Sequence, residues 1–263
     1  MRSSLLRRFL LLLLLCLQYG RAGAQVRDGK LQVVYNPPQS ASGKIWEAAV
    51  QKGQFYEKAA NRLNNYLAWP RDVLIVVGDI GTANCFYSGD QHRIYMGYEM
   101  YDFVFNCFKS IEDDGSALRH TFLSMDFFFY HEMGHCLVGE FNLPITGREE
   151  DAADDLAAVS LAEGGQYGAD VALAAAQFFE IMSRGADVKK LPFWDEHSLD
   201  AQRFYNILSV FYGSNPNRYM FIEKIVPART LARSQHDFLH KQRSWDRILN
   251  QHLREPKNTG EVF

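Results

Sequence analysis

Five consecutive residues suggest a specific chemistry in this chain of 263 residues. They are His131, Glu132, Met133, Gly134 and His135. Residues four apart on an α-helix project from the same face, so the two imidazoles would converge on one point. Two neutral imidazoles are half of the ligand set of a tetrahedral zinc ion, and Glu132 is placed to act on a water bound to that ion. The alternative is that both histidines simply pack on a helix.

The sequence around this motif predicts a long, buried helix over residues 118–140. Residues 123–130 and 136–138 are apolar almost all round, which is typical of a helix enclosed by other elements. Gly134 lowers the helix propensity by about 1 kcal/mol relative to alanine. We interpret it as a point where another backbone or a substrate approaches closely. The phenylalanines at 127–129 are expected in the core rather than in a substrate pocket.

A second helix, predicted over residues 150–163, offers a third metal ligand. Its start is rich in acidic side chains, which the helix dipole favours at that end. Glu150 is the preferred ligand because Asp154 follows four residues later on the same face. Asp154 could accept a hydrogen bond from the outer N–H of a ligand histidine and fix its orientation. Glu149 and Asp151 are competing ligands, and the acidic cluster could also serve only the helix dipole.

This pattern is similar to that of the gluzincin metallopeptidases, in which HExxH is followed by ExxxD. The interval between the two motifs is shorter here than in thermolysin. More closely, the chain resembles a family of secreted bacterial proteins described as candidate metallopeptidases, a domain of unknown function. The stretches that carry this resemblance are 82–87, 97–99, 131–135, 143–154 and 195–206.

The resemblance implies a zincin-like fold and a catalytic Glu132, without implying a particular substrate. The ligands that it implies for one zinc ion are His131, His135 and Glu150. The chain departs from the family in one respect. Members of the family are expected to carry cysteines at the positions near Ile80 and at Gly97, and this chain has neither. This departure concerns any disulfide carried over from the family and leaves the expected metal site unaffected.

Residues 1–24 are expected to be a signal peptide rather than part of the fold. Three arginines precede an apolar run from Phe9 to Leu17, and residues 22–24 fit a cleavage site. The run is shorter than the roughly 20 residues that a membrane-spanning helix needs. We therefore expect export to the periplasm or the extracellular space, with no stable membrane span after cleavage. An uncleaved anchor is the alternative.

Charge and cysteine content restrict the partners. Without residues 1–24 the chain loses four arginines and no acidic residue, which leaves 24 basic and 31 acidic side chains and a net charge near −7. Because no basic cluster is present, we expect no binding to nucleic acid or to an anionic membrane. Cys85 and Cys107 are the pair to test for a disulfide, and Cys136 is expected to be a small buried hydrophobe.

Residues 25–263 are expected to form a single domain, since their number fits one large core and no repeat or linker interrupts them. A small twisted sheet followed by a predominantly helical C-terminal half would be the α+β arrangement of a zincin-like metalloprotease fold. Strands are predicted at 31–35, 72–77 and 92–98. Helices are predicted at 44–67, 99–111, 118–140, 150–163, 168–184, 199–212, 217–225 and 229–252. An interruption is considered at Gly53 in the first of these, and breaks are expected in the last.

Two further features could serve catalysis or only structure. Acyl hydrolysis needs a donor aimed at the developing oxyanion, and His197 is the first candidate, with Arg203 or Tyr205 the second. A histidine at a helix start and a structural ion pair of Arg203 would explain these residues equally well. The strand at 92–98 could be the edge along which an extended peptide lies, or simply a structural strand.

Together these features predict a zinc-dependent hydrolase that acts outside the cytoplasm. The favoured interpretation is a metallopeptidase with a peptide or protein substrate. Glu132 would be the general base on a zinc-bound water and would pass the proton to the leaving amine. The alternative is a catalytically inactive zinc-binding protein that binds a peptide or a cell-envelope partner. A third hypothesis is a secreted helical domain without a metal.

Overall fold

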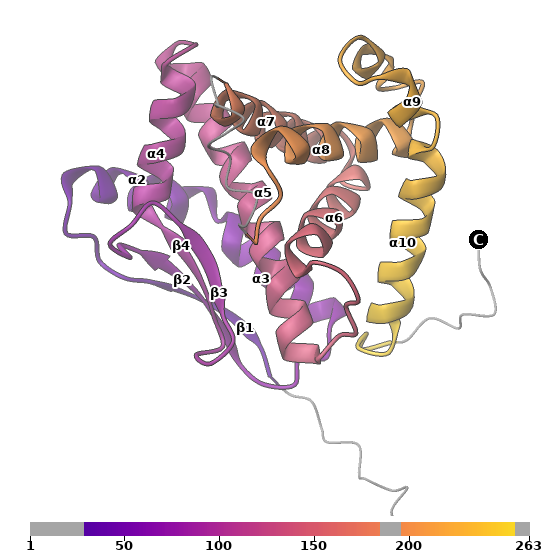
Figure 1. Cartoon of the computed structure of the whole chain (residues 1–263). Helices are drawn as coiled ribbons and strands as arrows, with labels where there is room; N and C mark the ends of the chain where they lie inside the picture. Colours follow the sequence, from indigo (N-terminus) through magenta and orange to yellow (C-terminus); the bar gives the residue numbers. More distant parts are fainter. Residues whose placement is uncertain (1–28, 185–195, 256–263) are drawn as a thin grey trace, which may run out of the picture.

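The structure is a computed structural model and describes residues 29–184 and 196–255 (Figure 1). The predicted signal peptide at 1–24 lies outside the described residues. So does residue 195, the first position of one stretch of the family resemblance. Within the described part of the chain, no helix combines the length and the apolar character needed to cross a membrane.

A four-stranded sheet with the order β1-β2-β4-β3 forms one side of the molecule. β1 (Leu31–Tyr35) and β4 (Arg93–Gly97) run parallel to β2 (Val73–Gly78), which lies between them. β3 (Cys85–Ser88) pairs antiparallel with β4. β2 is a continuous apolar run because it is buried on both faces.

The sheet corrects one interpretation of the sequence. The strand considered as a peptide-binding edge is β4, but β4 is an inner strand that pairs with a neighbour on each side. The edge beside the central helix is β3, which the sequence did not predict as a strand. Positions 80 and 97, where family members are expected to carry cysteines, are adjacent, since a Cβ on Gly97 would lie 2.9 Å from the Ile80 side chain.

The interruption considered at Gly53 is confirmed, because the region predicted as a helix at 44–67 consists of α2 (Ala41–Gly53) and α3 (Phe55–Tyr66). Gln54 separates them with a left-handed backbone, φ 53°. α4 (Tyr98–Lys109) follows the sheet directly. The thiols of Cys85 and Cys107 are both free, so the disulfide considered for this pair is absent, whereas Cys136 is fully buried as predicted.

The central element is α5 (Asp114–Phe141), which runs through the middle of the molecule (Figure 1). It begins where the Asp113 side chain accepts hydrogen bonds from two backbone N–H groups, and it ends at Asn142 with φ 50°. β3 and β4 pack on one side of it, and α6 (Glu149–Ala162) and α7 (Gly165–Ser183) pack on the other. This enclosure explains why the helix is apolar all round.

The C-terminal half is almost entirely helical, so the predicted α+β arrangement with a small sheet first and helices after is confirmed. α8 lies against α7, α6 and α10. The helix predicted at 217–225 is only a short 3-10 segment, η2. The bounds of these elements are α6 Glu149–Ala162, α7 Gly165–Ser183, α8 Asp200–Ser214, η2 Met220–Lys224, α9 Ala228–Leu231 and α10 Ser234–Asn250.

Candidate metal centre

Three predicted ligand side chains meet at one point between α5 and α6. The Nε2 atoms of His131 and His135 are 3.3 Å apart, and Glu150 Oε2 lies 3.2 Å from the first and 3.3 Å from the second. Zinc–ligand distances of about 2.0–2.1 Å in a tetrahedron separate the ligand atoms by about 3.3–3.4 Å. The donor types and their spacing therefore fit a zinc ion.

Carboxylates on α6 hold the outer nitrogens of both imidazoles. His131 Nδ1 lies 2.8 Å from Asp154 Oδ1, and His135 Nδ1 lies 2.7 Å from Glu149 Oε1. Because an ionised carboxylate only accepts hydrogen bonds, each Nδ1 carries a proton, and Nε2 is the nitrogen that can offer a lone pair to a metal once the metal displaces any proton there. Glu149, a competing ligand in the sequence, thus lies on the far side of a ligand histidine from the metal position.

Asp154 is itself held by Arg203. The guanidinium donates from Nε to Oδ2 over 2.8 Å and from Nη2 to Oδ1 over 2.7 Å, which is a bidentate pair. Arg203 is thus committed to Asp154, away from the role of oxyanion donor considered for it. Tyr205, which was considered together with Arg203 as an oxyanion donor, is 41% exposed and lines a cavity that contains none of the predicted metal ligands.

The charges in this site stabilise one another strongly. Burial alone would raise the pKa of the Glu150 carboxyl, but hydrogen bonds from three imidazoles hold that pKa far below its usual range. Burial opposes a charge on His135, yet Glu150 and Glu149 raise its pKa to about 9. An ion bound here would therefore displace protons from the imidazoles.

Glu132 lies beside the convergent ligands and is held by the edge strand. It is 7% exposed, and its Oε2 accepts a hydrogen bond of 2.8 Å from the backbone N–H of Tyr87. Burial raises the pKa of the Glu132 carboxyl, although the two neighbouring imidazoles partly oppose this shift. The Tyr87 hydroxyl donates to Glu140 Oε1 on the same helix over 2.8 Å. One residue of β3 thus fastens the strand to α5 at two points.

His197 reaches the same centre from outside the two helices. Its Nε2 lies 3.0 Å from Glu150 Oε2, and its side chain is 45% exposed. Ligand atoms of His131, Glu150 and His197 all lie within 4.8 Å of one another, so this set could also hold a metal ion. The structure brings His197 to the site, while its role stays a prediction.

Side chains at the start of α6 hold the segment that carries His197. Arg148 Nη2 donates to the carbonyl oxygen of His197 over 3.2 Å and also to that of Glu196. Ser198 Oγ donates to Asp151 Oδ1 over 2.6 Å. The sequence did not predict the role of Arg148, and it suggested for Asp151 only a metal ligand or a charge that favours the helix dipole. These contacts join residues nearly fifty positions apart.

Gly134 allows α5 and α6 to approach closely. A Cβ at this position would lie 2.8 Å from Cα and 3.0 Å from Cβ of Ala153. Ala153 lies between Glu150 and Asp154 in the sequence, so this contact sets the distance from the two carboxylates to the histidines. The close approach expected from the sequence is therefore that of the α6 backbone.

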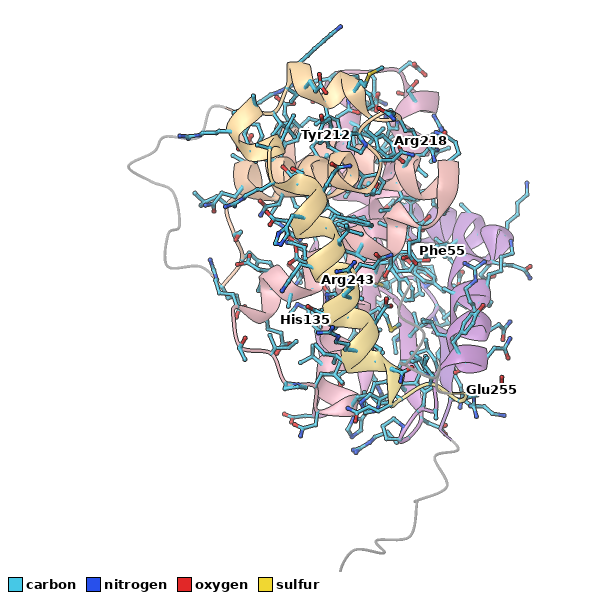
Figure 2. The ribbon with its side chains drawn as sticks, turned by 90° about the vertical axis from the view of Figure 1, so that its right-hand side faces the viewer. Phe55, His135, Tyr212, Arg218, Arg243 and Glu255 are labelled. Atoms are coloured by element: carbon cyan, nitrogen blue, oxygen red, sulfur yellow. The ribbon has the colours of Figure 1, made fainter. Side chains whose placement is uncertain are left out.

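A mainly apolar cavity of about 570 Å³ adjoins the centre, and His131, Glu132 and His197 belong to its wall. Phe127 and Phe129 are fully buried in the core as predicted, whereas Phe128 both packs in the core and lines this cavity. His135 does not line this cavity; Figure 2 shows it from the side of α10, which faces the viewer. The other apolar residues of the cavity wall are Cys85, Met100, Phe103, Phe178, Phe179, Met182, Leu199 and Ala201.

Comparison with known proteins places the chain in a family. Neither a curated protein nor a solved structure matches it. A family model matches residues 35–249, a range that contains α5, α6 and the segment carrying His197. The chain therefore belongs to the DUF4344 family, which bears the description "Putative metallopeptidase".

Proposed function

We propose that this protein is a zinc-dependent peptidase with a zincin-like fold, built by residues 25–263 as one domain. Family membership supports a metallopeptidase, and one observation supports zinc in particular. This observation is the spacing of 3.2–3.3 Å among the Nε2 atoms of His131 and His135 and Oε2 of Glu150. One zinc ion held by these atoms would lower the pKa of a water molecule and polarise a peptide carbonyl.

Glu132 is proposed to move the proton. Its Oε2 is held by the Tyr87 N–H, so we assign the exchange of protons to Oε1. The carboxyl lines the cavity next to His131, where a substrate would lie against the ligand atoms. Glu132 would accept a proton from the attacking water and deliver it to the nitrogen of the leaving amine.

His197 is proposed to stabilise the developing oxyanion rather than to bind zinc. Its imidazole is partly exposed and lies on the cavity side of Glu150. A donor at this position could shift from the Glu150 carboxylate to the substrate oxygen when negative charge develops there. Arg148 would keep the backbone of His197 in place during that shift.

The proposal is tested with the mature protein, loaded with one equivalent of zinc, on a proteome-derived peptide library. Glu132→Gln keeps the size of the side chain and the hydrogen bond from Tyr87, so zinc content should match the wild type. We expect cleaved peptides from the wild type and none from the variant. Equal cleavage by both forms would overturn the assignment of Glu132. Full zinc occupancy with no cleavage by the wild type would instead favour the inactive zinc-binding alternative.

Export is part of the proposal. The sequence at 1–24 supports it, and the test is the N-terminal sequence of the protein recovered from a secreting host. A mature chain that starts at Gln25 in the exported fraction is expected. Retention of the full chain inside the cell would contradict export without affecting the assignment of the metal centre.

A further inference from the structure

We propose that the substrate is an extended polypeptide that places two bulky apolar side chains in two adjoining cavities on the leaving-amine side of the cleaved bond. The inference rests on the proposed peptidase function and specifies its substrate class. It is carried by the lining of the cavity beside Glu132, by a second cavity next to it, and by the residues that the two cavities share.

The first cavity is built to receive an apolar side chain. Aromatic rings of Phe128, Phe178 and Phe179 form much of its wall, and Met182 adds a flexible apolar contact. The guanidinium of Arg203 lies over the Phe179 ring at 4.1 Å, but its hydrogen bonds go to Asp154. This cationic group is therefore already engaged. Polar side chains of Asn84, Ser183, Ser198 and Asp200 also line the cavity, but most of its wall is apolar and favours an aromatic or long aliphatic side chain.

The position of Glu132 indicates which part of the substrate enters this cavity. Glu132 and His131 line it, whereas His135 and Glu150 do not. His197, proposed to face the carbonyl oxygen, also lines this cavity, so both residues that flank the cleaved bond lie near it. We assign the cavity to the residue that contributes the leaving nitrogen, because this nitrogen must lie next to the Glu132 carboxyl that delivers its proton.

A second, mainly apolar cavity of about 650 Å³ shares two lining residues with the first. Ser183 at the end of α7 and Ala201 at the start of α8 line both cavities, so two small side chains form the ridge between them. α7 and α8 lie next to each other along the upper part of the molecule in Figure 1. The apolar wall of the second cavity includes Leu173, Phe204, Tyr205, Leu208, Phe221 and Ile225.

Large apolar side chains are exposed at this second cavity. Tyr205 is 41% exposed, and Phe221 and Ile225 are each 44% exposed. Apolar side chains that gather around a hollow on the surface are typical of a binding site. Because Ser183 and Ala201 line this hollow as well as the cavity beside Glu132, the occupant that we infer is the same substrate chain, extended beyond these two residues.

The test compares the cleavage of three fluorogenic peptides by the zinc-loaded protein. All three share one sequence, which extends to a phenylalanine directly after the cleaved bond. One peptide ends there, one continues with Ser-Ser-Ser, and one continues with Leu-Leu-Leu. Burial of a leucine-sized side chain corresponds to a gain of about tenfold or more. We expect kcat/KM for the leucine peptide to exceed that for the serine peptide by at least about tenfold.

Variants locate this gain. Phe221→Ser removes an apolar side chain from the second cavity and should bring the ratio of kcat/KM for the leucine peptide to kcat/KM for the serine peptide close to one. Ala201→Trp places a bulky side chain between the two cavities and should lower this ratio as well. Met220→Ser is the matched control, because Met220 is 60% exposed and lines neither cavity, and should keep the wild-type ratio. Circular dichroism and the melting temperature establish that each variant is folded.

The outcomes separate this inference from the proposed function. Cleavage of all three peptides with a ratio near one in the wild type would overturn the two-cavity inference and leave the peptidase function intact. A large ratio that survives both Phe221→Ser and Ala201→Trp would also overturn it. No cleavage of any peptide or of the library would overturn the peptidase function, and this inference with it.

Discussion

A hydrogen bond of 2.8 Å joins Nδ1 of His131 on α5 to Oδ1 of Asp154 on α6. Burial of Asp154 opposes its negative charge, but the Arg203 guanidinium and His131 hold the pKa of this carboxyl well below its usual range. The orientation of the imidazole proposed to bind the metal therefore depends on a buried ion pair. We expect the metal affinity of this site to be sensitive to residues that never touch the metal.

Replacement of Asp154 by asparagine should weaken zinc binding by about 10- to 100-fold, because the amide holds the His131 ring less strongly. Competition with a chromogenic chelator measures the affinity. Asp170→Asn is the control, since Asp170 pairs with an exposed Arg119 on the surface. Wild-type affinity in Asp154→Asn would show that this carboxylate does not orient the ligand.

The sequence could predict which side chains converge in the candidate metal centre because the decisive relationships are local. His131 and His135 are four residues apart on one helix, and Glu150 and Asp154 are four apart on another. Helical periodicity places each pair on one face without knowledge of the fold. The sequence alone did not show that α5 packs against α6. Gly134 predicted a close approach of another backbone or a substrate, but not which element approaches.

Other features depend on tertiary contacts that the sequence does not encode locally. Glu149 and Glu150 have the same side chain in adjacent positions, and only the docking of α6 decides that one reaches Nδ1 and the other Nε2. β3 is too short to show a strand pattern, and its pairing with β4 makes it an edge. Arg148 contacts a backbone carbonyl 49 residues away, a relationship without a sequence signal.

Gly134→Val should separate α5 from α6, because the added Cβ would lie 2.8 Å from the Cα atom of Ala153. We expect a loss of about 1–3 kcal/mol in the free energy of unfolding together with weaker zinc binding. Urea denaturation and the chelator assay measure the two effects. Gly53→Ala is the control, as a Cβ at Gly53 meets nothing within 4 Å. An unchanged zinc affinity in Gly134→Val would contradict the role given to this contact.

Asp126→Asn should change the pH dependence of stability. Asp126 is buried on α5, and burial raises its pKa to about 8, although the Tyr167 hydroxyl donates to it. A folded pKa above the unfolded value of 3.8 means that the contribution to stability is greatest below about pH 4 and is lost as the pH rises towards 8. The asparagine variant should therefore gain stability relative to wild type across this window, by at most about 1.4 kcal/mol per pH unit.

Urea denaturation of both forms at constant zinc, in steps from pH 5 to pH 9, measures this difference. Comparing the two proteins at each pH cancels the titration of all other groups. The difference should grow up to about pH 8 and then level off. A difference that stays constant over the whole range would contradict a raised pKa for Asp126.

His197→Ala should separate oxyanion stabilisation from metal binding. If His197 acts on the substrate, kcat should fall about 100-fold while zinc affinity changes little. Steady-state kinetics and the chelator assay report the two quantities on one preparation. A large loss of zinc affinity would instead show that His197 is a ligand, in keeping with its position near His131 and Glu150.

The most direct test is a crystal structure of the zinc-loaded protein with an anomalous difference map collected at the zinc edge. One peak should lie about 2.0–2.2 Å from Nε2 of His131, Nε2 of His135 and a carboxylate oxygen of Glu150. The account is contradicted if no peak appears between the two imidazoles at full zinc content, or if the ion is bound without His135.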